Sequence, residues 1–232
     1  MKLLAILEPV MLFVTPAALF LCAYFGLDQT ALLTMIAAIF SVIPFFVRFE
    51  KQKPRPRDIM PIVVLAAIAT AGRIIFMPFP NFKPLSAIVI IGGACFGSQS
   101  GFLTGALSVL ASNMVFSQGP WTPWQMYAFG LQGFLAGVLS RHGCFQKPLN
   151  VYIFGFLSAF MCGLILDTWT LTGFIEELTA QYVLTRYLLG LPFSLSSAVA
   201  TVVFLIPTFK PWSKKIERIQ TKYGFGMKNA SG

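Results

Sequence analysis

The side chains best suited to chemistry in this chain are aromatic rings and amides gathered around one short loop. The loop reads Gln118-Gly119-Pro120-Trp121-Thr122-Pro123-Trp124-Gln125 and lies between two apolar segments. Flat aromatic faces supply contact area for an organic solute, and a few amides fix its orientation. These residue types therefore predict recognition of an amphipathic organic solute rather than the making or breaking of bonds.

Constellations typical of catalysis do not occur in the sequence. The single histidine, His142, lies in a basic turn, and neither H-E-x-x-H nor G-x-S-x-G is present. Asp167, Glu176 and Glu177 could form a group of carboxylates, but they lie at an expected helix end and in a loop. We expect a protein that is not an enzyme, with no catalytic residue, no metal site and no permanently bound cofactor. There is also no G-x-x-x-x-G-K-[ST] motif for ATP hydrolysis by the chain itself.

The composition is that of a membrane protein. Hydrophobic residues make up 56% of the chain and charged residues 11%, with a mean hydropathy of +0.76. A soluble domain carries roughly a quarter charged residues. The expected fold class is therefore an all-α integral membrane protein, with no stretch polar and long enough for a soluble domain.

Eight apolar segments can be read as membrane spans, since a straight span needs roughly 20 apolar residues. The fourth and fifth are short and are separated only by Gly97-Ser98-Gln99-Ser100, so a helical hairpin is expected there. The eight segments are Leu3–Phe25, Thr30–Phe49, Arg57–Phe76, Leu85–Phe96, Gly101–Phe116, Trp124–Ser140, Leu149–Thr168 and Tyr187–Phe209.

Basic residues gather in the connections on one side of this arrangement. They lie between residues 51 and 57, between 141 and 147, and after the last span. Because cytoplasmic connections carry the excess of Lys and Arg, both termini are expected in the cytoplasm of a multi-pass plasma-membrane protein. Most of the net charge of +9 is explained in this way, and no nucleic-acid partner is needed. The expected parts are two additional N-terminal helices (1–50), a basic loop (51–57), a six-helix core (58–209) and a basic tail (210–232).

Pairs of small residues four positions apart mark three of the expected helices. They are Ala67 with Ala71, Gly101 with Gly105, and Gly133 with Gly137. Residues at this spacing share one helix face, and small side chains there allow helix backbones to approach closely within a bilayer. Such strips usually pack helices within one protein, and they can also receive a helix of a partner.

The region from about Arg57 to Phe209 resembles the substrate-binding S component of energy-coupling factor (ECF) vitamin transporters. The more specific likeness is the block GFLTGALSVLASNMVFSQGPWTPWQMYAFGLQGFLAG, which is similar to S components for cobalamin. The resemblance implies a six-helix substrate-binding core that captures a vitamin outside the cell, with cobalamin or a related corrinoid as the expected substrate.

The resemblance also implies partners. An S component docks on a transmembrane scaffold subunit, and two ATPase subunits use ATP to drive uptake. The family's docking feature is an A-x-x-x-A pair on the first core helix, which Ala67 and Ala71 match. Leu3–Phe49 departs from the minimal six-helix pattern, and its role is open.

The expected substrate-binding residues lie in outward loops or at nearby helix ends. Aromatic rings would cover the face of the solute, amides would meet its polar rim, and a cation would approach an anionic group. These residues are Arg73, Phe76, Phe79, Asn81, Lys83, Asn113, Gln118, Trp121, Trp124, Gln125, Tyr127 and Asp167.

Other interpretations of these residues remain open. Trp and Tyr gather at membrane interfaces without binding anything, Asn113 can bond to a neighbouring helix, and Arg73 can extend to lipid headgroups. The S-component fold serves several vitamins, so the ligand can be another vitamin or organic micronutrient. A small membrane scaffold or assembly protein is the alternative from a different class.

Overall fold

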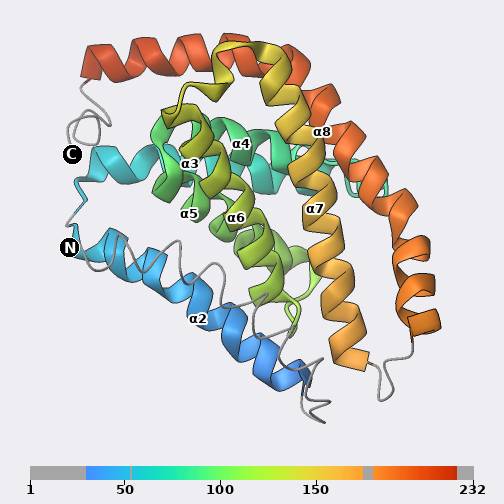
Figure 1. Cartoon of the computed structure of the whole chain (residues 1–232). Helices are drawn as coiled ribbons and strands as arrows, with labels where there is room; N and C mark the ends of the chain where they lie inside the picture. Colours follow the sequence, from blue (N-terminus) through green and yellow to red (C-terminus); the bar gives the residue numbers. More distant parts are fainter. Residues whose placement is uncertain (1–29, 53, 175–179, 224–232) are drawn as a thin grey trace.

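The structure is a computed structural model, and it describes residues 30–52, 54–174 and 180–223. Within these residues the chain forms seven α-helices and one short 3-10 helix, without a β-strand (Figure 1). The expected first span, Leu3–Phe25, lies outside the described residues. The elements are α2 (Thr30–Lys51), α3 (Pro56–Ile75), α4 (Leu85–Phe96), α5 (Ser98–Phe116), α6 (Thr122–Arg141), η1 (Cys144–Gln146), α7 (Pro148–Phe174) and α8 (Ala180–Tyr223).

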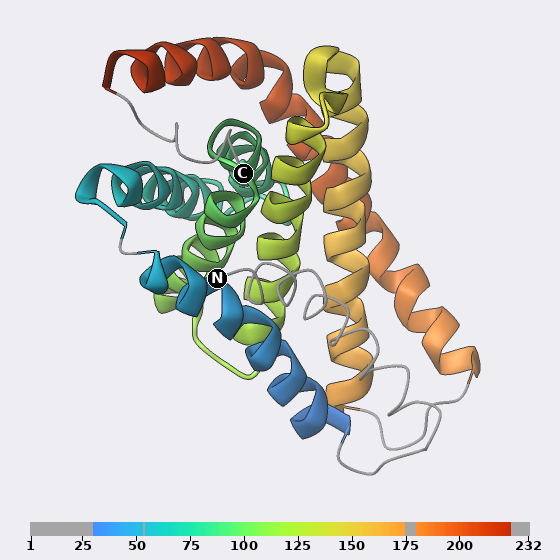
Figure 2. The same cartoon turned by 60° about the vertical axis from the view of Figure 1, so that its left-hand side comes forward.

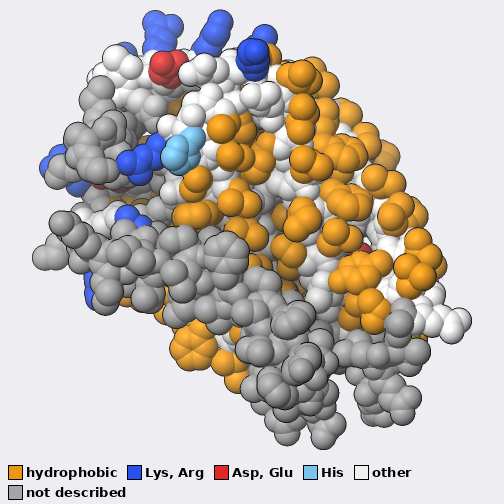
Figure 3. Space-filling view, in the orientation of Figure 1, with side chains coloured by type: hydrophobic (Ala, Val, Ile, Leu, Met, Phe, Trp, Pro, Cys, Tyr) orange, Lys and Arg blue, Asp and Glu red, His pale blue; other side chains and the backbone are white. Residues whose placement is uncertain are grey.

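Three helices in the described residues are long and apolar enough to cross a membrane. They are Pro56–Ile75, Pro148–Leu171 and Gln181–Lys222. Hydrophobic side chains cover much of the surface over α7 and α8, and Lys and Arg side chains gather mainly along its upper and left edges (Figure 3). A soluble monomer rarely exposes so wide an apolar surface. The described part of the chain thus fits the all-α membrane class, while the eight crossings and the orientation remain predictions.

The observed helices differ from the expected segments mainly at their ends. The segment Leu85–Phe96 is unchanged, whereas the last helix extends from Ala180 to Tyr223 instead of from Tyr187 to Phe209. The expected end at Phe209 rested on the loss of hydropathy, but Lys, Glu, Arg and Gln in the following residues are good helix formers. Pro207 and Pro211 lie inside this helix, where a proline removes one backbone hydrogen bond and kinks the helix without ending it.

Helix α4 lies at the centre of the fold. Nine consecutive residues, from Leu85 to Gly93, are buried, so all sides of the helix are covered. Gly97 follows α4 with φ of 92°, a conformation that favours glycine, and α5 begins at the next residue. The chain reverses there, which confirms the expected hairpin of two separate helices.

The hairpin packs against α6 through glycines whose backbones almost touch. A Cβ atom at Gly93 would lie 2.1 Å from the Gly133 carbonyl oxygen, and one at Gly101 would lie 2.3 Å from the same oxygen. A Cβ atom at Gly105 would lie 2.3 Å from the Phe129 carbonyl oxygen. Side chains at these positions would force the helices apart. The expected close packing at the Gly101/Gly105 and Gly133/Gly137 strips is thus a packing within the protein.

The remaining described helices surround this three-helix centre. Phe45 of α2 stacks on Phe102 of α5 with ring centroids 3.6 Å apart, and Phe134 of α6 meets Phe45 edge-on. Helices α7 and α8 lie side by side and cover the opposite flank (Figure 2). The C-terminal part of α8 bends over the end of α4, where Gln220 Nε2 donates a hydrogen bond to the Cys95 carbonyl oxygen at 2.8 Å.

Two adjacent glycines of α4 provide a matched test of the helix packing. Gly93→Ala should lower the free energy of unfolding by about 1–3 kcal/mol, because its Cβ meets backbone atoms that cannot move independently. Gly92→Ala should be close to neutral, since its nearest contact is the flexible Leu65 side chain at 3.3 Å. Thermal unfolding of both variants in detergent measures the difference. Equal melting temperatures for the two variants would contradict the close contact.

Candidate functional site

Two adjoining cavities, which we call the polar hollow, lie between α3, α4, α6, α7, α8 and the connection 76–84. Their volumes are about 120 Å³ and about 90 Å³. Both are lined by Asn81, Phe129, Leu166 and Ser197, so they meet along these side chains. The larger cavity is also lined by Cys162, Gly163, Asp167, Gly190, Phe193 and Ser194, and the smaller by Arg73, Lys83, Leu85, Ser86 and Gln125.

Two cations line one end of the hollow. Arg73 Nη1 donates hydrogen bonds to Ser112 Oγ at 2.6 Å and to Asn113 Oδ1 at 2.9 Å. The Arg73 guanidinium and the Lys83 ammonium both lie over the Phe116 ring, 4.9 Å and 4.8 Å from its centroid. Within the described residues, neither cation has a carboxylate at salt-bridge distance. This end of the hollow is therefore positively charged.

The local sequence explains how Arg73 reaches this position. Gly72, at the end of α3, packs against the Pro84 ring, where a Cβ atom would lie 2.6 Å from the ring. The close approach brings the end of α3 beside the start of α4. Between them Asn81 adopts φ of 55°, a left-handed conformation that asparagine tolerates better than most residues. The connection folds back so that Asn81 and Lys83 line the hollow.

A network of side-chain amides and a hydroxyl orients Asn113, which accepts a hydrogen bond from Arg73. Asn113 Nδ2 donates to Gln125 Oε1 at 2.9 Å and to Thr122 Oγ1 at 3.2 Å. Thr122 Oγ1 donates to Gln118 Oε1 at 3.0 Å, and Gln118 Nε2 donates to the Leu110 carbonyl oxygen at 3.0 Å. The network joins the end of α5 to the start of α6. It holds Asn113 in position to accept from Arg73.

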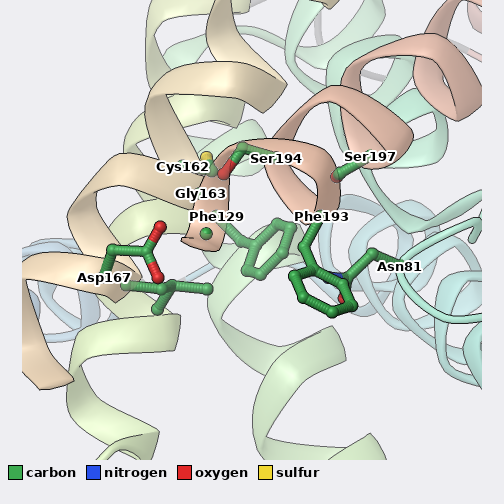
Figure 4. Close-up of a pocket in the computed structure, with 10 residues that line it drawn as sticks. Asn81, Phe129, Cys162, Gly163, Asp167, Phe193, Ser194 and Ser197 are labelled. Carbon is green, nitrogen blue, oxygen red and sulfur yellow. The ribbon is translucent and has the colours of Figure 1, made fainter. Parts of the chain in front are cut away.

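A carboxylate paired with a second arginine lies at the other end. Asp167 Oδ1 lies 3.0 Å from Arg186 Nη2, and this nitrogen also donates to Thr170 Oγ1 at 3.3 Å. Gly190 leaves room for the carboxylate, because a Cβ atom there would lie 2.0 Å from Asp167 Oδ2. Figure 4 shows Asp167 and Asn81 on either side of the Phe129 ring. The charge of Asp167 is thus already balanced within the protein.

The structure brings five of the twelve expected site residues to the hollow, namely Arg73, Asn81, Lys83, Gln125 and Asp167. Asp167 was expected at a helix end, yet it lies inside α7, because the apolar run continues helical to Phe174. Asn113 accepts a hydrogen bond from Arg73 of α3. This is the bond to a neighbouring helix that was the alternative role of Asn113. Gln118 is engaged in the same network.

The expected aromatic contacts lie elsewhere. Trp124 is fully buried against Trp169, at 6.3 Å between ring centroids, and Tyr127 is buried in the cluster around Phe45. Both were expected to face the solute, but they occupy the side of α6 that faces its neighbouring helices. Trp121 packs against the cluster that contains Trp124. Neither Phe76 nor Phe79 lines the hollow. The Phe76 ring meets the Phe204 ring edge-on, with 5.1 Å between ring centroids.

Several residues that line the hollow were not among the expected site residues. Phe129 and Phe193 supply its apolar walls, and Ser194 and Ser197 supply hydroxyls from α8. A signal for the serines was present in the sequence. Gly190, Ser194 and Ser197 follow one another at spacings of four and three, which places small and polar residues on one face of an otherwise apolar helix.

The fold and the hollow define a helical protein with membrane-length helices and a polar cavity between them. Residues 52–214 match the model of a family of unknown function, DUF6580. This match spans well over half of the chain, so the chain belongs to that family. It includes α3 to α7 and most of α8 and leaves out α2, which ends at Lys51. No curated protein and no solved structure matches the chain.

Proposed function

We propose that this chain is the solute-capture subunit of an ECF-type importer. The observation that carries the proposal is the polar hollow, a partly open pair of cavities between apolar helices with ionisable side chains at both ends. Ionisable residues inside a membrane protein are costly and usually mark a substrate or ion path. The resemblance of the block Gly101–Gly137 to S components supports the same conclusion.

The size of the hollow favours a small organic solute over a corrinoid. Its two parts measure about 120 Å³ and about 90 Å³, whereas sites for drug-sized ligands span roughly 300–1,000 Å³. Of the loop residues behind the corrinoid expectation, Trp121 and Trp124 pack in one cluster and Gln118 bonds within the network. Another vitamin or organic micronutrient is therefore the better substrate proposal, and cobalamin binding would require the helices to separate.

The proposed energy source is a partner module. Ala67 and Ala71 are exposed on α3, while Ala66 and Ala69 on the other side of the helix are buried. Val63 and Ile68 are exposed beside them. The exposed strip is apolar and low in relief, which suits close contact with a helix of a scaffold subunit. Two ATPase subunits on that scaffold would supply the ATP-driven step.

A binding screen tests the capture function. Isothermal titration of the purified chain with thiamin, riboflavin, biotin, folate, pantothenate, cobalamin and cobinamide should give saturable binding for a small vitamin. Corrinoids should bind more weakly, because the hollow is too small for the ring system. Absence of binding heat with every compound, together with co-purification of the chain with a membrane protein complex, would contradict the proposal and favour the scaffold alternative.

Docking is tested by separating uptake from binding. Ala67→Trp and Ala71→Trp should each reduce uptake of the bound solute in cells of the source organism by about tenfold or more, because added bulk separates the helices. Binding to the purified chain should remain unchanged, since neither residue lines the hollow. Ala111→Trp, an exposed alanine of α5, serves as the matched control. Full uptake by both α3 variants would show that this face does not dock.

A further inference from the structure

The start of α4 is a buried helix end that borders the smaller cavity of the hollow. Leu85 and Ser86 are each 3% exposed, and both line the smaller cavity. The preceding residue, Pro84, provides no side-chain cap, and the first turn contains no acidic residue. The first amides of a helix have no partner within the helix, and a buried end normally needs an acceptor for them.

The first amide of α4 with an acceptor among the described residues is that of Ile88, in the first i→i−4 bond of the helix. The Ile88 amide donates to the Pro84 carbonyl oxygen at 3.1 Å. The amides of Leu85, Ser86 and Ala87 have none in this part of the chain. Free amides combine with the positive end of the helix dipole to favour an anion at this position.

The two cations converge on the same cavity. Arg73 and Lys83 line it together with Leu85 and Ser86, and no carboxylate of the described residues neutralises them. Burial, and then the nearby Arg73 guanidinium, lower the pKa of the Lys83 ammonium below its ordinary value. An anion placed between the two side chains would relieve this repulsion and accept hydrogen bonds from both.

From this geometry we propose that the hollow is a site for an organic anion, whose carboxylate or phosphate is held by Arg73, Lys83 and the start of α4. The inference rests on the proposed capture function and defines the substrate class. The rest of the solute extends past Phe129 toward Phe193, with Asn81, Gln125 and Ser197 as polar contacts. Because Asp167 is paired with Arg186, the far end does not require a cationic group.

Matched solute pairs at constant ionic strength test the inference. The purified full chain is titrated with nicotinate and nicotinamide, with pantothenate and pantothenol, and with riboflavin phosphate and riboflavin. Inorganic phosphate serves as the probe for the anion alone. Its binding is measured through its effect on thermal unfolding. Phosphate should raise the melting temperature of the wild-type chain, because a ligand that binds only the folded state stabilises it. In the pair that binds, the anionic member should bind roughly ten- to hundredfold more tightly.

Single-residue variants distinguish an effect of charge on anion binding from an effect on the stability of the fold. Lys83→Gln should reduce anion binding about tenfold with only a small change in the melting temperature of the unliganded chain, because Lys83 lies in a connection and the variant removes its contact with the Phe116 ring but no hydrogen bond of the described network. Arg73→Gln should do the same if it folds, and Arg73→Lys should retain part of the affinity. Lys210→Gln, on the exposed basic part of α8, is the control and should leave binding unchanged.

The outcomes distinguish this inference from the capture function on which it rests. A neutral solute that binds equally to the wild type and to Lys83→Gln would overturn the anion site and leave the capture function in place. Absence of stabilisation by phosphate and of binding by every solute would overturn both. Preference for riboflavin phosphate alone assigns a phosphate, and preference for nicotinate or pantothenate assigns a carboxylate.

Discussion

The arrangement of this protein depends on the near contact of three helix backbones at Gly93, Gly101 and Gly133. In a bilayer no hydrophobic force pushes helices together, so packing must be close to be favourable. The three glycines let α4 lie deep among α5, α6 and α8 with all of its sides covered. A helix in that position begins inside the protein instead of at its surface. The buried start of α4, with its free amides, is a direct consequence of this packing.

The second constraint is electrostatic. A guanidinium inside an apolar helical protein is stable only if polar groups replace the water around it. Ser112 and Asn113 perform this role for Arg73, and the amide network through Gln125 keeps Asn113 oriented. At the other end of the hollow Arg186 does the same for Asp167. The protein therefore balances one end internally and leaves the other end positive, and this asymmetry underlies the anion proposal.

The helical class and the α4–α5 hairpin could be predicted because they depend on local signals, namely hydropathy and a Gly-Ser turn. The same holds for the glycine strips, whose spacing by itself places small residues on one helix face. Which residues line the hollow was harder to predict. Trp124 and Gln125 are adjacent in sequence, yet one is in the core and the other lines the hollow, because successive residues of a helix point in directions about 100° apart.

Residues far apart in the sequence made the remainder of the site unpredictable. Phe129, Phe193 and Ser194 come together only through the packing of α6, α7 and α8, which no local pattern encodes. The extension of α8 past Phe209 was missed because hydropathy measures fit to a membrane and not helix formation. The lining of the hollow thus depends on contacts between helices, whereas the extension of α8 depends on helix propensity, which hydropathy does not report.

The most direct measurement is an experimental structure of the purified chain with its tightest-binding solute. We expect density in the polar hollow, with an anionic group within hydrogen-bond distance of Arg73, Lys83 and the amides of Leu85 and Ser86. Density for the solute among the loop residues Gln118–Trp121, with the hollow unchanged, would contradict it.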